Sequence, residues 1–297
     1  MEPLKQSVLC TVVSNDRVGT DVYRMTLNAA VIATSAVPGQ FVAVRCGGLD
    51  AILRRPFGVC ETQPETGNFT VMYQVKGKGT QLLSRCRTGE RLDVLGPLGN
   101  GFKPEAAQTG KTAIIGGGIG IFPLLFLART VRREGIEPPD IYLGFRDREA
   151  MLLESEFAAC TSNLMIATED GSSGARGFVT EPFLRRCAES THEPAYQMVY
   201  ACGPEPMLRS VQRICVQYGI ESELSLEQRM ACGIGACLVC ACAVKRQNAE
   251  ADTALERTEP DTASDKTEVD TAQEDSWQYA HVCKDGPVFR GDEVIFE

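Results

Sequence analysis

The chain has 297 residues, of which 43% are hydrophobic and 23% charged, a composition typical of a globular protein with room for two or three domains. Its net charge is −9, but residues 246–276 hold ten acidic side chains against three basic ones, so the rest of the chain is nearly neutral and a nucleic-acid partner is not indicated. There is no apolar run of about 18 residues and no apolar secretory leader, so we expect no membrane span and a cytoplasmic protein with reduced thiols.

Residues 1–104 predict a small antiparallel β-barrel. Short stretches in which apolar and polar residues alternate are separated by turns rich in Gly, Pro and Asn. The clearest of these stretches are residues 8–13, 22–27, 40–45 and 69–75.

Two short motifs in the predicted barrel could bind a diphosphate. Arg54 and Arg55 stand at the start of a strand, and an arginine can bind a diphosphate through two parallel hydrogen bonds. Residues 77–83 form a glycine turn that enters a helix, with Thr80 as the expected N-cap, and a helix N-terminus offers free N–H groups to a phosphate. Both motifs also occur in ordinary turns, so neither is decisive by itself.

Residues 105–222 predict a parallel α/β domain, because short apolar strands alternate with helices. The expected strands are residues 112–115, 140–145, 164–168 and 197–202, and the expected helices are residues 121–129, 150–159, 178–190 and 204–218.

The first strand of this domain is followed by a glycine turn and a helix, the opening of a dinucleotide-binding unit. The glycines are Gly116, Gly117, Gly118 and Gly120. The Rossmann fingerprint G-x-G-x-x-G is absent, because Ile121 and Pro123 stand where its last glycine would fall, although a turn that binds phosphate remains expected. Ligands of such sheets bind at the carboxyl ends of strands. These ends include residues 144–146, residues 168–171 and the run Cys202, Gly203 and Pro204.

Residues 223–297 predict a small iron–sulfur domain. Cys232, Cys237 and Cys240 have the spacing C-x4-C-x2-C, and with the distant Cys283 they match the plant-type ligand pattern of a 2Fe–2S cluster. Glycines at 233 and 235 let the backbone direct N–H groups at sulfur. A four-thiolate zinc site is the alternative, although such sites usually have two short C-x2-C pairs. Cys242 is either a small buried residue or a competing ligand.

The acidic stretch at 246–276 contains no aromatic residue and few large apolar ones, so it cannot bury enough surface to form a core. We predict a loosely ordered surface insertion between short strands within 241–246 and 277–297. The two histidines, His192 and His281, lie outside any hydrolase or Rieske pattern and are expected to be structural.

These motifs, in this order, resemble the ferredoxin-reductase superfamily, and within it the electron-transfer subunits of type B dihydroorotate dehydrogenase. The resemblance covers nearly the whole chain apart from the acidic stretch. The family's flavin motif Arg-Pro-x-Ser matches residues 55–58, with Gly58 in place of serine, and its Tyr-x-Val-x-Gly-x-Gly-Thr motif matches residues 73–80. Residues 227–237 match its cluster entry, and residues 283–289 match its closing ligand, which favours Cys283 over Cys242.

The resemblance implies three cofactors: FAD in the barrel, NAD(H) in the α/β domain and the 2Fe–2S cluster. The implied FAD contacts are Arg55, Pro56, Phe57, Gly58, Met72, Tyr73, Gln74, Gly79 and Thr80. The implied NAD(H) contacts are Gly116, Gly117, Gly118, Gly120, Cys202, Gly203 and Pro204. No acid–base residue is expected, because hydride transfer to a flavin depends on positioning.

The implied function is electron transfer between dihydroorotate and NAD⁺ in pyrimidine biosynthesis. Dihydroorotate would be oxidised in a separate FMN-containing catalytic subunit, in a heterotetramer with two copies of each chain. Two alternatives stay open. One is the flavin subunit of another complex, such as an NADH-dependent ferredoxin:NADP⁺ oxidoreductase or a sulfite reductase, and the other is a redox-sensing iron–sulfur module. Arg146 and Arg148 could suit the 2′-phosphate of NADP, whereas the resemblance favours NAD.

Overall fold

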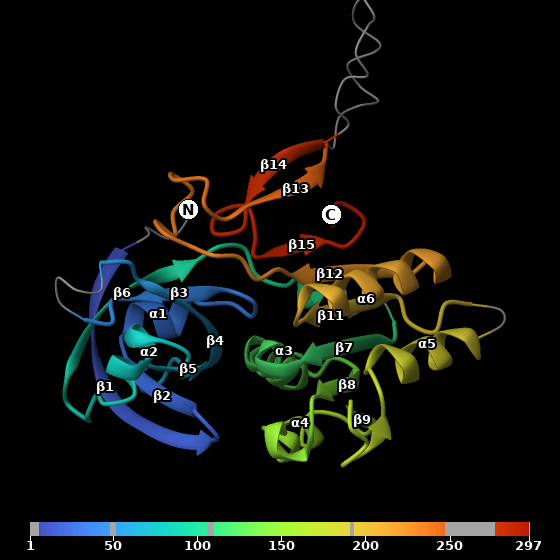
Figure 1. Cartoon of the computed structure of the whole chain (residues 1–297), viewed down its shortest axis with the longest axis horizontal. Helices are drawn as coiled ribbons and strands as arrows, with labels where there is room; N and C mark the ends of the chain where they lie inside the picture. The colour runs from blue at the N-terminus through green and yellow to red at the C-terminus, as the bar shows by residue number, and fades with distance from the viewer. Residues whose placement is uncertain (1–5, 48–51, 106–109, 191–192, 247–276, 297) are drawn as a thin grey trace, which may run out of the picture.

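The computed structural model describes residues 6–47, 52–105, 110–190, 193–246 and 277–296. The barrel and the α/β domain lie side by side, and the C-terminal region lies across both of them (Figure 1). Apart from Arg246, the predicted acidic insertion falls outside the described residues, as does His192. No helix in the described ranges is long and apolar enough to cross a membrane.

The N-terminal part is a closed antiparallel barrel of six strands in the order β1-β2-β5-β4-β3-β6, which confirms the predicted barrel. Its strands are β1 (Gln6–Gly19), β2 (Val22–Asn28), β3 (Phe41–Val44), β4 (Arg55–Gln63), β5 (Asn68–Gln74) and β6 (Arg91–Leu98), and its helices are α1 (Ala30–Ser35) and α2 (Lys78–Leu83). The sequence analysis missed β6, because Gly96 and Pro97 interrupt its alternating pattern. Pairing with β1 and β3 closes the barrel there.

The α/β part contains a seven-stranded sheet in the order β10-β9-β8-β7-β11-β12-β15. Its strands are β7 (Thr112–Gly117), β8 (Asp140–Phe145), β9 (Leu164–Thr168), β10 (Ala175–Arg176), β11 (Met198–Cys202), β12 (Glu221–Ser225) and β15 (Val288–Arg290). All neighbours pair in parallel except β12 and β15, so the predicted parallel sheet is confirmed with one antiparallel edge strand.

Helices cover both faces of this sheet. One face packs against α3 (Ile121–Arg133) and α4 (Glu154–Ala158), and the other against α5 (Thr180–Ala188) and α6 (Glu205–Tyr218). Two short 3-10 turns, η2 (Gly118–Gly120) and η3 (Arg148–Ala150), follow β7 and β8. Thus every expected helix of this part is present.

The C-terminal region is joined to the sheet rather than standing apart from it. It forms a hairpin of β13 (Ala241–Lys245) and β14 (Trp277–His281) and then adds β15 to the sheet edge. Strand β12 runs across residue 222, where the sequence analysis divided the second part from the third.

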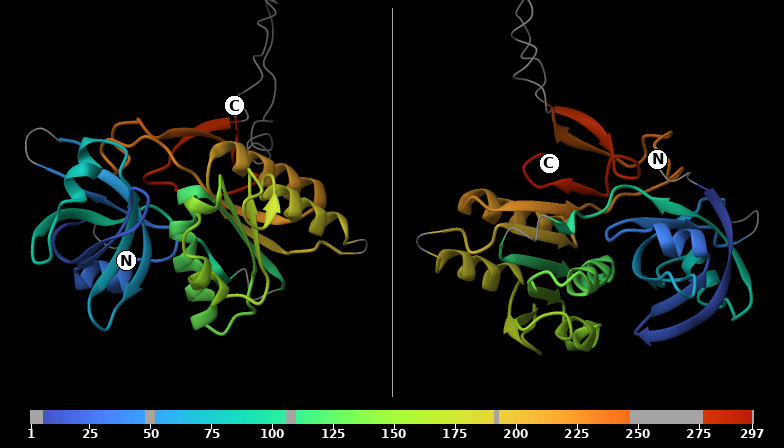
Figure 2. Two further views of the ribbon diagram at one scale, coloured as in Figure 1. Left: turned by 60° about the horizontal axis from the view of Figure 1, so that its bottom comes forward. Right: turned by 180° about the vertical axis from the view of Figure 1, so that it is seen from behind.

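The barrel contacts both other parts. Across the seam with the α/β domain, Arg24 pairs with Glu156 at 2.8 Å and Arg129 pairs with Glu61 at 2.5 Å. Helix α3 lies between the barrel and the sheet (Figure 1). Toward the C-terminal region, the Asn100 N–H donates to the Gly286 carbonyl at 2.6 Å. Figure 2 shows this region lying over the junction of the other two.

A buried polar network links the amino-terminal ends of β7, β8 and β11. The Tyr196 hydroxyl donates to Asp140 Oδ2 at 2.7 Å and lies 2.7 Å from the Tyr142 hydroxyl, while Lys111 Nζ is 2.8 Å from the same carboxylate. Tyr196 is fully buried. This network lies at the amino-terminal ends of the strands, whereas the glycine turn lies at their carboxyl ends.

We expect Tyr196→Phe to lower the free energy of unfolding by about 1–3 kcal/mol, because a buried carboxylate loses a donor. Chemical denaturation followed by circular dichroism measures the change. The matched control is Tyr279→Phe, since that ring is 66% exposed. Equal effects of the two substitutions would contradict the role given to the network.

Candidate functional site

A cavity of about 250 Å³ lies where the three parts meet. The barrel contributes all the predicted flavin contacts except Arg55, Gly79 and Thr80 to its wall, namely Pro56, Phe57, Gly58, Met72, Tyr73 and Gln74. The α/β domain contributes Phe122, Pro123 and Cys202, and the C-terminal region contributes Met230 and Pro287. The structure therefore brings the predicted flavin motif, one end of the dinucleotide unit and both cluster segments to one place.

The barrel wall of this cavity is aromatic. The ring of Tyr73 stacks on Tyr23 at 5.7 Å and lies 5.4 Å from the ring of Phe57. The Tyr73 hydroxyl donates to Asn15 Oδ1 at 2.9 Å, and burial raises the pKa of Tyr73, so it stays neutral. The rings of Phe57 and Tyr73 are tilted by 46° and offer aromatic, apolar surface, which suits the isoalloxazine ring of a flavin.

The two consecutive arginines Arg54 and Arg55, of which the second begins the flavin motif, have different surroundings. Arg54 is held in the barrel, where its Nη2 lies 2.8 Å from Asp93 Oδ2 and its Nη1 donates to the Asp93 carbonyl at 2.9 Å. Arg55 instead lies against Gly79, where an added Cβ would be 3.1 Å from Arg55 Nε. Arg55 and the glycine turn are therefore neighbours, as a shared diphosphate site requires.

Thr80 is not the N-cap that the sequence analysis expected. Gly77 caps α2, and Thr80 is the third residue of the helix. Its hydroxyl accepts from the N–H groups of Lys76 and Gly77 at 3.0 and 3.2 Å. The prediction was wrong because a threonine can stabilise a helix start either as the N-cap or from the third helical position, where its hydroxyl reaches back to N–H groups before the helix. The extended backbone at Gly77 makes that residue the N-cap, so Thr80 takes the second role.

A second cavity, of about 450 Å³, lies beside the glycine turn. Gly117, Gly118 and Gly120 line it together with Pro204, whereas the other predicted NAD(H) contacts, Gly116, Cys202 and Gly203, do not. Glycine is required here by close approach: a Cβ on Gly120 would lie 2.6 Å from the Cys202 carbonyl oxygen, and one on Gly203 would lie 3.0 Å from the Gly117 nitrogen. The turns after β7 and β11 thus form one surface, and at Gly118, where φ is +54°, there is open space for a ligand.

Glu227 joins the two cavities and was not among the predicted site residues. Its side chain lines both of them, and Lys76 does so from the opposite side. The surrounding walls raise the pKa of the Glu227 carboxyl, and the charge of Lys76 acts against this effect. The signal that would have found Glu227 is its place just beyond the carboxyl end of β12, where sheets of this kind bind ligands.

The four predicted cluster ligands come together as two pairs. Cys232 contacts Cys237, and Cys240 contacts Cys283. Two pairs of thiols suit a cluster with two irons, each held by two cysteines.

Backbone N–H groups around the loop point at the cysteine sulfur atoms. Gly235 N–H donates to Cys283 Sγ at 3.1 Å, and Ala236 and Ile234 N–H donate to Cys232 Sγ at 3.3 and 3.4 Å. Burial acts to raise the pKa of Cys232, but these donors and Cys237 outweigh it and lower that pKa to about 6. The loop therefore stabilises thiolate charge at Cys232, which fits a cluster of negative net charge. At Cys283, burial and the neighbouring Cys240 outweigh the Gly235 donor and raise the pKa of the thiol to about 12. The positive φ values of Gly233 and Gly235, 72° and 83°, produce this orientation.

Cys242 has a different environment from the four cysteines. It lines a third cavity with Leu208 and Phe296, and burial raises the pKa of its thiol to about 11. Cys242 is half-buried rather than buried, so the prediction that it does not bind the cluster rests on its place within β13 and not on full burial.

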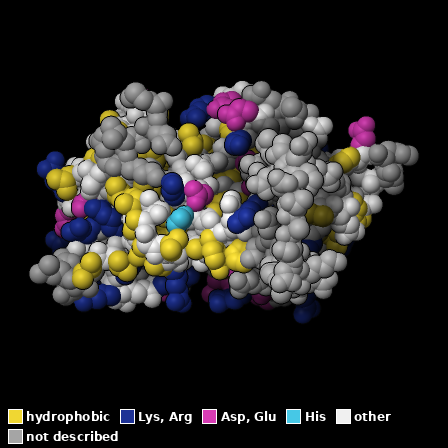
Figure 3. Space-filling view, turned by 90° about the horizontal axis from the view of Figure 1, so that it is seen from above, with side chains coloured by type: hydrophobic (Ala, Val, Ile, Leu, Met, Phe, Trp, Pro, Cys, Tyr) yellow, Lys and Arg dark blue, Asp and Glu magenta, His cyan; other side chains and the backbone are white. Residues whose placement is uncertain are grey.

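The cluster loop also carries exposed apolar side chains. Ile234 is 45% exposed, Leu238 61% and Val239 52%, and Leu238 holds the left-handed φ of +59° that non-glycine residues rarely adopt. Seen from above, hydrophobic side chains gather on the face that holds the C-terminal region (Figure 3). We call Ile234, Leu238 and Val239 the loop patch.

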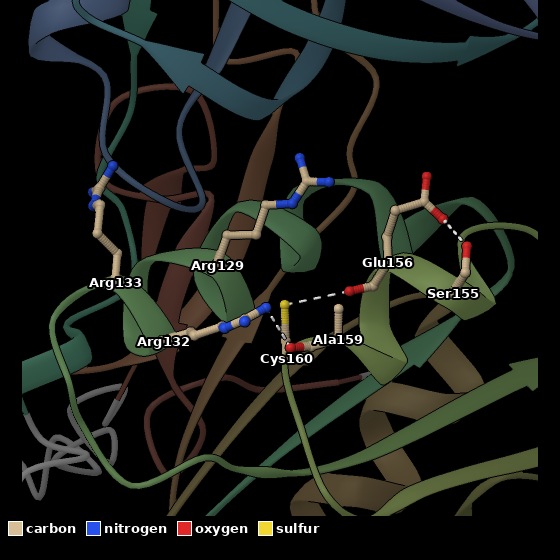
Figure 4. A pocket seen from close by; sticks show the side chains of 7 residues that line it. All are labelled: Arg129, Arg132, Arg133, Ser155, Glu156, Ala159 and Cys160. Atoms are coloured by element: carbon tan, nitrogen blue, oxygen red, sulfur yellow. Dashed lines mark hydrogen bonds between the residues drawn. The ribbon is translucent and has the colours of Figure 1, made fainter.

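A groove of about 510 Å³ between α3 and α4 is separate from these sites (Figure 4). Three arginines line it, but Arg132 donates to the Ala159 carbonyl at 2.6 Å and Arg129 pairs with Glu61 across the barrel seam. None of the predicted site residues lines this groove. All the residues that line it belong to the α/β domain, and two of them, Arg129 and Glu156, also pair with barrel residues.

Three family models match the chain. The oxidoreductase FAD-binding domain matches residues 9–102, the oxidoreductase NAD-binding domain matches residues 114–213, and the iron–sulfur cluster binding domain of dihydroorotate dehydrogenase B matches residues 227–254 and 268–295.

Complete proteins are similar as well. The chain is 38% identical over 287 residues to the dihydroorotate dehydrogenase B (NAD(+)) electron transfer subunits of Geobacillus sp. (strain WCH70) and Bacillus caldolyticus, covering 96% of this chain and 97% of each relative. A solved structure of an NADH-dependent reduced ferredoxin–NADP oxidoreductase superposes with a TM-score of 0.75 at 27% identity, covering 98% of this chain and 91% of that one. The Amycolatopsis cytochrome P450 reductase GcoB shares the fold. It superposes with a TM-score of 0.59 at 21% identity, covering 72% of this chain and 66% of that one.

We expect serine in place of Cys232, Cys237, Cys240 or Cys283 to abolish the visible absorption of the cluster, because each removes one thiolate ligand. Iron and labile sulfide should both be present at about two per chain before substitution. Cys242→Ser is the matched control and should keep both. Zinc instead of iron in anaerobically purified protein, or loss of the cluster in the control, would refute the assignment.

We expect Arg55→Ala to weaken FAD retention by about tenfold or more, since it removes a hydrogen bond to a charged group worth roughly 1.5–3 kcal/mol. Flavin absorbance after gel filtration gives the occupancy. Arg87→Ala, which removes an exposed arginine of the same barrel, should retain FAD. Full occupancy in the Arg55 variant would mean that Arg55 does not hold the diphosphate.

Proposed function

The chain belongs to the family of dihydroorotate dehydrogenase B electron-transfer subunits, and from this premise we propose that it carries electrons from dihydroorotate, oxidised in a separate subunit, to NAD⁺. It is an NAD-linked oxidoreductase subunit with FAD-binding, NAD-binding and iron–sulfur domains. The observation that carries the proposal is the shared cavity at the junction, whose wall includes residues of all three parts.

The fold gives each proposed cofactor residue a distinct task. The aromatic wall of Phe57 and Tyr73 would bind the flavin ring, and Arg55 with the turn at Gly79 would bind its diphosphate. The glycine surface formed by the turns after β7 and β11 would bind the phosphates of NAD(H). FAD, when bound, can accept a hydride and release its electrons singly.

Both cluster segments reach the flavin cavity. Met230 stands two residues before Cys232, Pro287 stands four residues after Cys283, and both line the wall. Gly233 also packs on the barrel, where an added Cβ would lie 3.5 Å from Leu98 Cδ1. The cluster would therefore sit against the wall of the flavin cavity, with no intervening domain, as rapid single-electron exchange requires.

The terminal chemistry would occur in a partner chain. Its proposed identity is an FMN-containing catalytic subunit, in a heterotetramer with two copies of each chain. The exposed loop patch beside the cluster supports a docking face there, because exposed apolar groups that cluster on a surface mark interaction sites. All thirteen cysteines lie in described residues and none forms a disulfide, which supports a reducing cytoplasm as the location.

A second candidate is the flavin subunit of a ferredoxin:NADP⁺ oxidoreductase. It is favoured by the similarity to the solved NADH-dependent enzyme, which covers nearly the whole chain. The two candidates differ in the partner and in the final acceptor, so one reconstitution experiment separates them.

The isolated chain should oxidise NADH with artificial acceptors but should not oxidise dihydroorotate, because we place that oxidation in the separate catalytic subunit. Adding an FMN-containing dihydroorotate dehydrogenase subunit should give NAD⁺-linked orotate formation, followed by absorbance. The rate should collapse in Cys237→Ser and persist in Cys242→Ser.

Normal NAD⁺ turnover by a complex that lacks the cluster would show that the electron path is wrong. Failure to bind such a subunit, together with ferredoxin-linked NADP(H) activity, would favour the second candidate.

A further inference from the structure

The cavity beside the glycine turn has a charged end. There its wall is built by Phe145, the last residue of β8, and by Arg146, Asp147 and Glu149, which follow the strand. Strand β8 is the parallel neighbour of β7, with Gly117 opposite Gly144. The glycine turn and this charged end therefore lie at adjacent strand ends.

The position of Asp147 matches a general rule for dinucleotide sites. When the phosphates lie on the glycine turn after one strand, an acidic residue beyond the end of the next strand accepts a hydrogen bond from the 2′-hydroxyl of the adenosine ribose. Asp147 lies two residues beyond β8, and its side chain is 23% exposed within the cavity wall.

Asp147 also forms an ion pair with the neighbouring Arg146. Arg146 Nε lies 2.7 Å from Asp147 Oδ2, while Asp147 Oδ1 accepts from the Ala150 N–H at 2.9 Å. The Arg146 side chain is 81% exposed, so this pair contributes little to stability and its main consequence is local charge. Glu149 and Glu169 lie near enough to add their negative charge to the same guanidinium.

We infer that Asp147 is the residue that selects NAD(H) over NADP(H). This inference rests on the proposed dinucleotide site. The Asp147 carboxylate accepts from a ribose 2′-hydroxyl and repels a 2′-phosphate. It also occupies Arg146 Nε, so it competes with that phosphate for the arginine at this end of the cavity. Arg148, the other arginine considered for this role, does not line the cavity.

The test measures binding of two probes, ADP-ribose and its 2′-phosphate, to the FAD-loaded full chain by isothermal titration calorimetry. These probes differ only at the 2′ position and need neither nicotinamide nor the partner subunit. The wild-type chain should bind ADP-ribose more tightly by about tenfold or more, the difference expected for one hydrogen bond to a charged group.

Asp147→Asn should raise the affinity for the 2′-phosphate probe by about tenfold, because repulsion is removed and Arg146 is released. Asparagine keeps an oxygen that can accept from Ala150, so η3 is retained, and thermal melting checks this. The double variant Arg146→Ala with Asp147→Asn should lose most of the gain. Glu137→Gln, which removes one exposed carboxylate from the same part of the chain, is the control for net charge and should leave the ratio unchanged.

The two hypotheses fail differently in this experiment. If the wild-type chain binds neither probe, the proposed dinucleotide site is wrong, and this inference is wrong with it. If ADP-ribose binds but Asp147→Asn leaves the ratio of affinities unchanged, or if Glu137→Gln shifts it equally, the selectivity inference alone is overturned.

Discussion

The junction of the three parts depends on glycines that let backbone segments meet without side chains between them. Gly120 brings the turn after β7 against Cys202, where a Cβ would lie 2.6 Å from the carbonyl oxygen. Gly58 brings the barrel against α3, with a Cβ position 3.1 Å from the Pro123 ring. Gly99, at φ +74°, brings the barrel against the cluster segment, with a Cβ position 2.5 Å from the Gly286 carbonyl oxygen. Any side chain at Gly99 or Gly120 would push the binding surfaces apart.

This close approach has a direct consequence for electron transfer. A carrier that exchanges a hydride on one side and single electrons on the other needs both partners near one ring. Here one cavity takes part of its wall from the dinucleotide domain, at Cys202, and part from the cluster segments, at Met230 and Pro287. Close approach also explains why Gly58 stands where the family's flavin motif has serine. Position 58 faces Pro123 at the barrel seam and has little room for a side chain.

Local patterns were predictable from the sequence, and features made by tertiary contacts were not. The cysteine spacing and the glycine turn are short motifs whose chemistry requires those residues, so they could be recognised without the fold. Strand β6 could not, because Gly96 and Pro97 break its pattern and only closure of the barrel gives it partners. Glu227 was missed because its importance comes from two cavities that meet at its side chain. The roles of Arg146 and Asp147 could not be predicted either, because the sequence indicates both charges but not that they pair with each other or which one faces a ligand.

The hairpin of the C-terminal region explains how a long acidic stretch can interrupt a cluster domain. Cys240 and Cys283 flank one end of the hairpin, where Ala241 pairs with His281. The acidic stretch leaves and re-enters at the other end, where Lys245 pairs with Trp277. The full length of both strands thus separates Lys245 and Trp277, which flank the stretch, from the two ligands at the other end of the hairpin.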